Sequence, residues 1–272
     1  MFLTKNPVSL QELKTVPVPE ETATYVPVGH GEVAEIVKRI GSAYLGEHLS
    51  SGYGLSKDGQ QMFGVHRFKS PLPNELTTTI GFRNSLNKTL SWGVVGGTGI
   101  LVCDNQCFFG EFVATRKHTR NVMRDAIANT EHVAKSMYQG SEGVTPLFDE
   151  FVKTKAILQE TTIDDDIAWA FLGVALGRKV IRHQHHKRAM KEWKVPRYPE
   201  WNDRTAWALY NACTEAMKGQ TQREVAHRFI ALHALFVWWF CEGREAPAAA
   251  GPSPIIRAAQ GEVSNRFRTL EM

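Results

Sequence analysis

Cysteine is scarce in this chain, since only four of its 272 residues are cysteines. Cys103 and Cys107 form one C-x3-C pair without a second pair, so the four-ligand pattern of a structural zinc site is missing. We interpret these two as small apolar residues beside a turn. All four cysteines are expected to stay as thiols in a reducing compartment.

Long apolar runs are also lacking. The densest apolar stretch, residues 230–241, contains His233 and is shorter than the roughly 18 residues that a membrane-spanning helix requires. Residues 1–6 contain no apolar signal core. We therefore expect a cytoplasmic protein with no membrane partner.

No large imbalance of charge is present, because the formal net charge is +4 and the pI is about 8.8. This total permits a polyanionic partner without requiring one. The distribution is more informative than the total. Between Arg178 and Arg197 the chain has eight Lys or Arg residues, three His residues and a single acid, Glu192.

Two periodicities of the apolar residues divide the chain. Over residues 32–45, and again after residue 119, the apolar residues fall three or four apart, which predicts helices. Between residues 51 and 117 they alternate with polar residues, and the Asp58-Gly59 pair between two such runs predicts a tight hairpin. The predicted fold class is α+β, with a mainly antiparallel sheet of about six strands in the N-terminal half, packed with a helical C-terminal half.

The same patterns predict individual elements. The run Gly96-Gly97-Thr98-Gly99 is followed by no Lys-Ser or Lys-Thr pair and by no helix, so we interpret it as a turn and not as a phosphate-binding loop. Thr162 is expected to begin a helix with Ile167 and Phe171 on its buried face, and Asn202 is expected to cap the next one. Four further strands are expected, at 76–82, 90–95, 99–102 and 107–114. The expected parts of the chain are an N-terminal arm at 1–21, a β-rich part with one early helix at 22–118, a helical part at 119–243 and a flexible tail at 244–272.

Polar side chains cluster at the predicted strand ends between residues 77 and 119. A sheet that only builds a core would end in ordinary turn residues. A guanidinium suits a phosphate or a carboxylate, and together with the neighbouring cations it would form a cationic patch. The residues expected to contact nucleic acid in this region are Arg83, Asn84, Ser85, Lys88, Asn105, Arg116, Lys117 and His118.

Other interpretations of this patch stay open. Arg116 and His118 could instead cap the helix that follows, and Asn84 and Ser85 are ordinary turn formers. Asp104 could orient the cations by ion pairing, or it could bind a metal ion together with His118. No cofactor is predicted.

The basic segment between residues 178 and 197 has two explanations. Cations at the end of a helix complement its dipole, but eight of them exceed that need, and contact with a polyanion explains the rest. A metal site at His183, His185 and His186 is disfavoured, because their cationic neighbours would repel a metal ion. The residues expected to extend the phosphate track here are Arg182, Lys187 and Arg188.

Three aromatic residues, Trp193, Tyr198 and Trp201, lie in or beside this basic segment. Aromatic faces next to cations suit single-stranded nucleic acid, because bases can stack on the rings while the cations follow the backbone. The alternative is that these rings hold a proline-containing loop against the helices.

Carboxylate and imidazole groups could also face each other across two predicted helices. Glu215 lies on one of them, and His227 and His233 lie on the next. Such a pair could act as acid, base or ligand, although a hydrogen bond between the two helices explains it better.

Six segments, taken in their order along the chain, resemble a known family. They are Tyr25-Val26-Pro27-Val28, Leu55-Ser56-Lys57-Asp58-Gly59, Gly81-Phe82-Arg83-Asn84-Ser85, Val102-Cys103-Asp104-Asn105, Arg116-Lys117-His118-Thr119-Arg120 and Arg204-Thr205-Ala206-Trp207-Ala208-Leu209-Tyr210-Asn211-Ala212-Cys213-Thr214-Glu215. The family is that of the phage/plasmid-like proteins catalogued as domain of unknown function 932 (DUF932). The resemblance implies a product of a mobile element that acts in the cytoplasm of a bacterial host, near DNA replication, recombination or host takeover. It implies no agreed catalytic residues.

The leading hypothesis is a nucleic-acid-binding protein of a phage or plasmid that binds single-stranded DNA in recombination, annealing or replication. Its layout resembles in outline that of ring-forming annealing proteins, so homo-oligomers are expected. A second hypothesis is a metal-dependent nuclease or phosphotransfer enzyme that uses Asp104, His118 and Glu215, but two-metal chemistry needs more carboxylates than these. A third is a host-takeover factor that acts through contacts with host proteins.

Overall fold

The computed structural model describes residues 6–69, 76–100, 106–108, 113–114, 118, 120–138, 147–221 and 224–242. These residues fall into two compact units. The first, here called the sheet unit, comprises Met1–Phe108, Phe112–Asp149 and Lys218–His227. The second, here called the helical unit, comprises Phe109–Glu111, Glu150–Met217 and Arg228–Met272.

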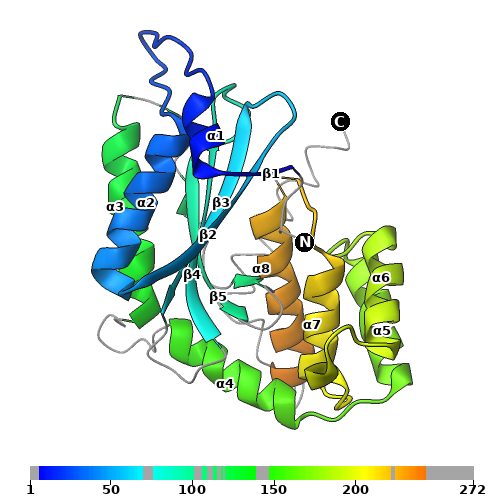
Figure 1. The fold of residues 1–272 in the computed structure, drawn as a ribbon. Helices are drawn as coiled ribbons and strands as arrows, with labels where there is room; N and C mark the ends of the chain where they lie inside the picture. The colour runs from blue at the N-terminus through cyan, green and yellow to red at the C-terminus, as the bar shows by residue number, and fades with distance from the viewer. Residues whose placement is uncertain are drawn as a thin grey trace, which may run out of the picture. The chain divides into compact units, whose positions relative to one another are not determined.

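The sheet unit is built on an antiparallel sheet (Figure 1). Its strands pair in the order β1-β2-β3-β4-β5-β6, and β7 also pairs with β5. The strands are β1 (Pro7–Val8), β2 (His48–Leu55), β3 (Gln61–Lys69), β4 (Leu76–Ser85), β5 (Gly93–Ile100), β6 (Gln106–Phe108) and β7 (Val113–Ala114). The predicted α+β class, with its mainly antiparallel sheet, is confirmed.

The hairpin between β2 and β3 turns at the predicted Asp-Gly pair. Asp58 Oδ1 accepts a hydrogen bond from the backbone N–H of Gln60 at 3.1 Å, and Gly59 has a φ of 72°, which glycine adopts without strain. The resulting register pairs Leu55 with Met62.

Strands β4 and β5 are longer than their sequence pattern indicates. Residues 83–85, predicted to end a strand, continue β4, and all ten residues of β4 are buried. The run from Gly96 to Gly99 was predicted to be a turn, but it lies inside β5 and pairs with β4. A Cβ atom added at Gly96 would lie 3.2 Å from Met137 Sδ, so the missing side chain lets a helix approach the strand closely.

Three helices belong to the sheet unit: α1 (Leu10–Thr15), α2 (His30–Leu45) and α3 (Val122–Tyr138). Helices α2 and α3 lie side by side on one face of the sheet (Figure 1). Gly41 of α2 faces the Phe68 ring of β3, and His66 Nε2 donates to the backbone oxygen of Ala34 at 2.9 Å. The expected N-terminal arm contains both β1 and α1. Ser9 is the N-cap residue of α1 and forms a capping box with Glu12.

The other helices are α4 (Leu147–Glu160), α5 (Asp165–Gly177), α6 (His183–Lys194), α7 (Ala206–Ala216) and α8 (Val225–Phe236), together with the short helices η1 (Pro199–Trp201) and η2 (Val237–Glu242). Asp164, and not Thr162, caps α5, and its carboxylate accepts from the N–H of Ile167 at 2.8 Å. Thr162 is extended instead, because it forms a β-bridge with Thr205. Thr205, and not Asn202, caps α7.

The basic segment forms a helix of its own. Lys179, just after the end of α5, has a left-handed φ of 59°, which stops the helix before the segment begins. Helix α6 then starts at His183. The idea that these cations only complement the end of the preceding helix therefore explains little of the segment.

No helix in the described part of the chain is long and apolar enough to cross a membrane.

Candidate functional site

Helix α6 has one buried face and one exposed face. His185, Ala189 and Trp193 follow each other at intervals of four residues, and each is at most 2% exposed. This spacing places them on one side of the helix. The rest of α6 is dominated by charged and polar residues, which meet solvent.

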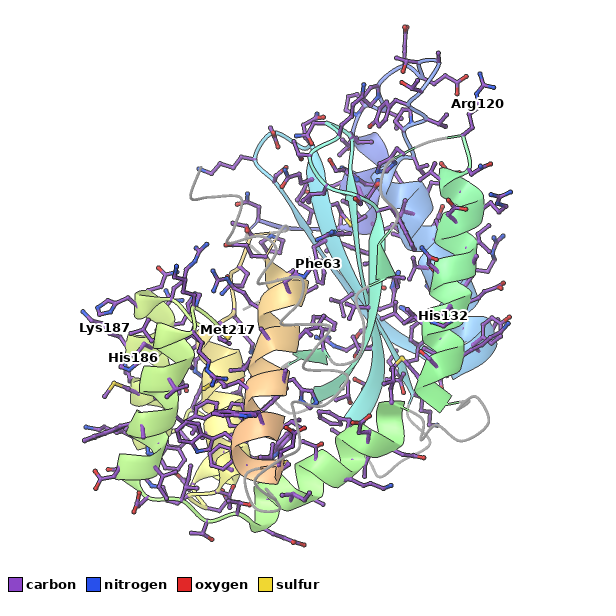
Figure 2. The ribbon with its side chains drawn as sticks, turned by 180° about the vertical axis from the view of Figure 1, so that it is seen from behind. Phe63, Arg120, His132, His186, Lys187 and Met217 are labelled. Carbon is purple, nitrogen blue, oxygen red and sulfur yellow. The ribbon has the colours of Figure 1, made fainter. Side chains whose placement is uncertain are left out.

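The exposed side of α6 carries a row of basic residues. His183, Lys187, Lys191 and Lys194 are separated by four, four and three residues, so they share one face. Arg182 and Arg188 flank this row and are also exposed. We call the set of Arg182, His183, Lys187, Arg188, Lys191 and Lys194 the α6 basic face. Figure 2 shows Lys187 on the outer side of α6.

Most cations of the α6 basic face are not neutralised by nearby acids. Lys187, Arg188 and Lys191 form no ion pair with any residue that the structure describes. Burial, and to a smaller extent the neighbouring His183, lowers the pKa of His186.

Of the three aromatic residues proposed from the sequence to stack on bases, two are buried. Trp193 and Trp201 are buried, and Trp193 Nε1 donates to Asp165 Oδ1 at 2.8 Å. The rings of Tyr198 and Trp201 lie 4.7 Å apart. Two of the three rings thus have a structural role, whereas Trp169 of α5 is 40% exposed and lies beside Lys194.

Trp169, Lys191 and Lys194 were not singled out from the sequence. The spacing of the two lysines, which continues that of Lys187, would have revealed them. Trp169 was hidden because Ile167 and Phe171 were expected to define the buried face of α5. The residues that are buried there are Ala168, Phe171, Leu172 and Ala175.

The polar cluster predicted at the strand ends lies in the sheet unit, and most of its described members are buried. Arg83 is 8% exposed, and its Nε donates to the backbone oxygen of Ser91 at 3.2 Å. Its Nη1 lies 3.2 Å from Nε2 of His227. Ser85 is also buried and donates to Asn87 Oδ1 at 2.7 Å.

Asn84 joins β4 to the start of α2. Its Nδ2 donates to the backbone oxygen of Val28 at 2.8 Å and to Nδ1 of His30 at 3.0 Å. Because Nε2 of His30 contacts the backbone oxygen of Gly59 at 3.0 Å, Nε2 carries the proton and Nδ1 is the acceptor. Burial lowers the pKa of His30 to about 4, so the ring is neutral at pH 7.

His118 lies against the same region. It is 2% exposed, its ring centroid is 5.8 Å from that of Tyr25, and burial lowers its pKa. Neither of its ring nitrogens has a hydrogen-bond partner in the described part of the chain. A neutral, buried imidazole is a poor partner for phosphate.

Lys88 is the one described member of this predicted cluster that presents a charge to solvent. Its backbone has a left-handed φ of 63°, and its Nζ lies 4.5 Å from the centre of the Tyr25 ring. The predicted contacts Asn105, Arg116 and Lys117, and the metal candidate Asp104, lie outside the described residues.

The carboxylate and imidazole groups predicted to face each other have separate partners. Glu215 accepts from Arg197 at 2.9 Å, and Arg197 also donates to Glu192 at 3.0 Å. His233 Nδ1 lies 3.4 Å from the hydroxyl of Tyr210, and burial lowers the pKa of His233 to about 4. An ion pair and core contacts explain these groups without catalysis.

Within the described ranges, no group of three or more His, Cys, Asp or Glu residues is arranged to hold a metal ion. Cys213 is fully buried, and this burial raises the pKa of its thiol, so it is not a reactive thiolate.

Residues 21–236 match the sequence model of the family described as Domain of unknown function (DUF932). The match covers more than half of the chain and includes α6. No curated protein and no solved structure matches the chain.

Proposed function

This chain belongs to the DUF932 family, and from that premise we propose that it is a nucleic-acid-binding protein whose α6 basic face contacts phosphates. Single-stranded DNA in recombination, annealing or replication is the substrate and setting that we propose. Assembly into homo-oligomers belongs to the same proposal.

One observation carries this proposal: α6 presents a row of exposed basic residues whose lysines form no ion pair with any acid in the described ranges. Like charges on neighbouring helical turns repel each other, so such a row weakens the isolated helix. A polyanion removes that repulsion and releases the counterions condensed on its own phosphates. The arrangement is therefore more favourable with the ligand bound than without it.

The position of the row supports the same function. The buried residues His185, Ala189 and Trp193 fix one side of α6, so the lysines on the other side are held in a defined direction. Over the twelve residues from His183 to Lys194 the helix rises about 16 Å. A row of this length can follow several phosphates of an extended strand.

The test is binding of a labelled single-stranded oligonucleotide at low salt, measured by fluorescence anisotropy. The variant K187Q/R188Q/K191Q, here called the α6 variant, removes three charges from positions that are exposed. We expect its affinity to fall by at least about tenfold, because phosphate contacts supply most of the affinity in such complexes.

A matched control removes the same number and kind of charges elsewhere. The variant K38Q/R39Q/K135Q changes two lysines and one arginine that are exposed on α2 and α3. We expect it to bind as the unchanged protein does. Equal loss in both variants, or no binding by the unchanged protein at low salt, would exclude the α6 basic face as the site.

The cluster predicted at the strand ends is tested separately. Among its described members Lys88 alone is exposed and charged. Lys88→Gln weakens binding if this region also contacts phosphate. An unchanged affinity would limit the contact to the α6 basic face and to residues outside the described ranges.

A further inference from the structure

We infer that Trp169 is a base-stacking residue at one end of the α6 basic face, so that the ligand class is a nucleic acid with unpaired bases. This inference rests on the proposed function and deepens it. It assigns a specificity-determining role to Trp169 of α5, which lies next to the cations that would contact the phosphates of the nucleic acid.

Trp169 differs from every other tryptophan of the chain. Four of the seven tryptophans, Trp92, Trp193, Trp201 and Trp207, are at most 8% exposed. Trp238 and Trp239 are half-buried. Trp169 is 40% exposed, although it lies in the middle of a helix that buries Ala168 and Phe171 on its other side.

Trp169 is connected to the cation row through Lys194. The Nζ atom of Lys194 lies 5.1 Å from the centre of the Trp169 ring. Lys194 is the last residue of the row that contains Lys187 and Lys191, and a helix rises about 10 Å over the seven steps from Lys187 to Lys194. The ring therefore lies where a strand following the row would arrive.

Two acids of α5, Asp165 and Asp166, lie within about one turn before Trp169, and Asp165 already has partners of its own. The Oδ1 atom of Asp165 accepts from Arg204 at 3.0 Å and from Trp193 Nε1 at 2.8 Å. Its charge is thus paired with a cation of the same unit.

The combination of a ring with a row of cations favours one class of ligand. Lysines contact phosphates in single and double strands alike. A tryptophan ring can stack only on a base whose face is free, and the bases of a duplex are already stacked on each other. Trp169 therefore adds affinity for single strands and none for duplexes.

The inference is tested with Trp169→Ala and Trp169→Phe. Each is titrated with a labelled single strand, with a duplex of the same length and with heparin, which is a polyanion without bases. We expect Trp169→Ala to weaken binding of the single strand on the order of tenfold and to leave duplex and heparin binding unchanged. Trp169→Phe, which keeps an aromatic face, retains most of the affinity.

The outcomes separate this inference from the proposed function. If the α6 variant loses binding while Trp169→Ala binds the single strand normally, the proposed function stands and base stacking is wrong. If Trp169→Ala weakens binding of all three ligands equally, Trp169 is a structural residue and the inference is again wrong.

Tryptophan fluorescence gives a second readout that does not depend on affinity. A stacked base quenches the ring that it contacts, so saturating oligonucleotide should quench the unchanged protein more than Trp169→Phe. Trp238→Phe is the matched control, because Trp238 lies 4.1 Å from the guanidinium of Arg178 and is half-buried. Equal quenching in the two Phe variants would overturn the inference.

Discussion

In two buried histidines of the sheet unit, His66 and His30, a single backbone oxygen determines which ring nitrogen carries the proton. His66 is fully buried and donates from Nε2 to Ala34, so its Nδ1 must accept from the hydroxyl of Ser51 at 2.8 Å. His30 is held in the same way between Gly59 and Asn84. Burial lowers the pKa of His66 to about 3 and that of His30 to about 4.

These two histidines should make the protein sensitive to acid. Their folded pKa values lie below the unfolded value of about 6.5, so below that pH the unfolded chain takes up protons that the folded chain does not. The stabilisation is complete above pH 6.5 and is lost as the pH falls toward 4 and 3. We expect the free energy of unfolding to fall by up to about 1.4 kcal/mol per pH unit for each histidine, as measured by urea denaturation between pH 7 and pH 4.5.

His66→Gln identifies the residue responsible. The variant should be less stable at pH 7, because the packing around the ring is lost, but its stability should fall less steeply with acid. His132→Gln, at an exposed position of α3 (Figure 2), should leave the steepness unchanged. Identical slopes in the unchanged protein and in His66→Gln would contradict the assignment.

At the scale of elements, two glycines inside helices differ in the space available for a side chain. A Cβ atom at Gly41 of α2 would overlap the Phe68 ring of β3, whereas one at Gly173 of α5 would meet no described atom within 4 Å. Alanine is the better helix former by about 1 kcal/mol. Gly173→Ala should therefore raise the melting temperature, with a stabilisation of about 0.5–1 kcal/mol.

Gly41→Ala should have the opposite effect. The helical preference for alanine is the same, but the overlap with Phe68 should destabilise the protein by about 1–3 kcal/mol. Circular dichroism melts of the two variants provide the comparison. A melting temperature that rises in both would mean that α2 does not lie close against β3.

The elements also show which local patterns were reliable. The Asp-Gly hairpin and the helical spacing of α2 and α3 are decided by nearby residues, and both predictions are confirmed. The Gly96–Gly99 run was mistaken for a turn, whereas Gly96 admits Met137, which lies about forty residues away in the sequence. Thr162 was mistaken for a helix cap because its partner, Thr205, is equally remote in sequence.

At the scale of the whole molecule, affinity for nucleic acid should depend more on the position of the positive charges than on the net charge. The α6 variant and the α2/α3 control each remove three positive charges from a net charge of +4. If affinity for nucleic acid depended on total charge, both variants would lose it equally. If it depends on the α6 basic face, only the α6 variant loses it.

Salt dependence provides the measurement for this prediction. Each phosphate contact with a single strand contributes about 0.7 to the slope of log affinity against log salt concentration. The α6 variant should reduce that slope by up to about 2, and the control should retain the slope of the unchanged protein. A slope that is the same in all three proteins would contradict phosphate contact by α6.

The candidate sites differ in how far the sequence could predict them. A concentration of Lys and Arg is a local property, so Arg182, Lys187 and Arg188 were proposed from the sequence, and all three are exposed in α6 or at its N-cap. The surroundings of Arg83 and Asn84 are not local, because their partners His227 and His30 are 144 and 54 residues away. Long-range contacts of this kind bury polar groups that otherwise resemble a surface cluster.

The construction of α6 has a consequence for how the chain tolerates insertions. Its buried and basic faces are set by the count of residues along one helix, in which each residue advances the rotation by about 100°. One residue added between Ala189 and Lys194 would turn Lys194 away from Trp169 while keeping every charge. The helix should therefore accept many substitutions on its outer side but few insertions or deletions. A change in length rotates the residues that follow it and changes the direction in which their side chains point.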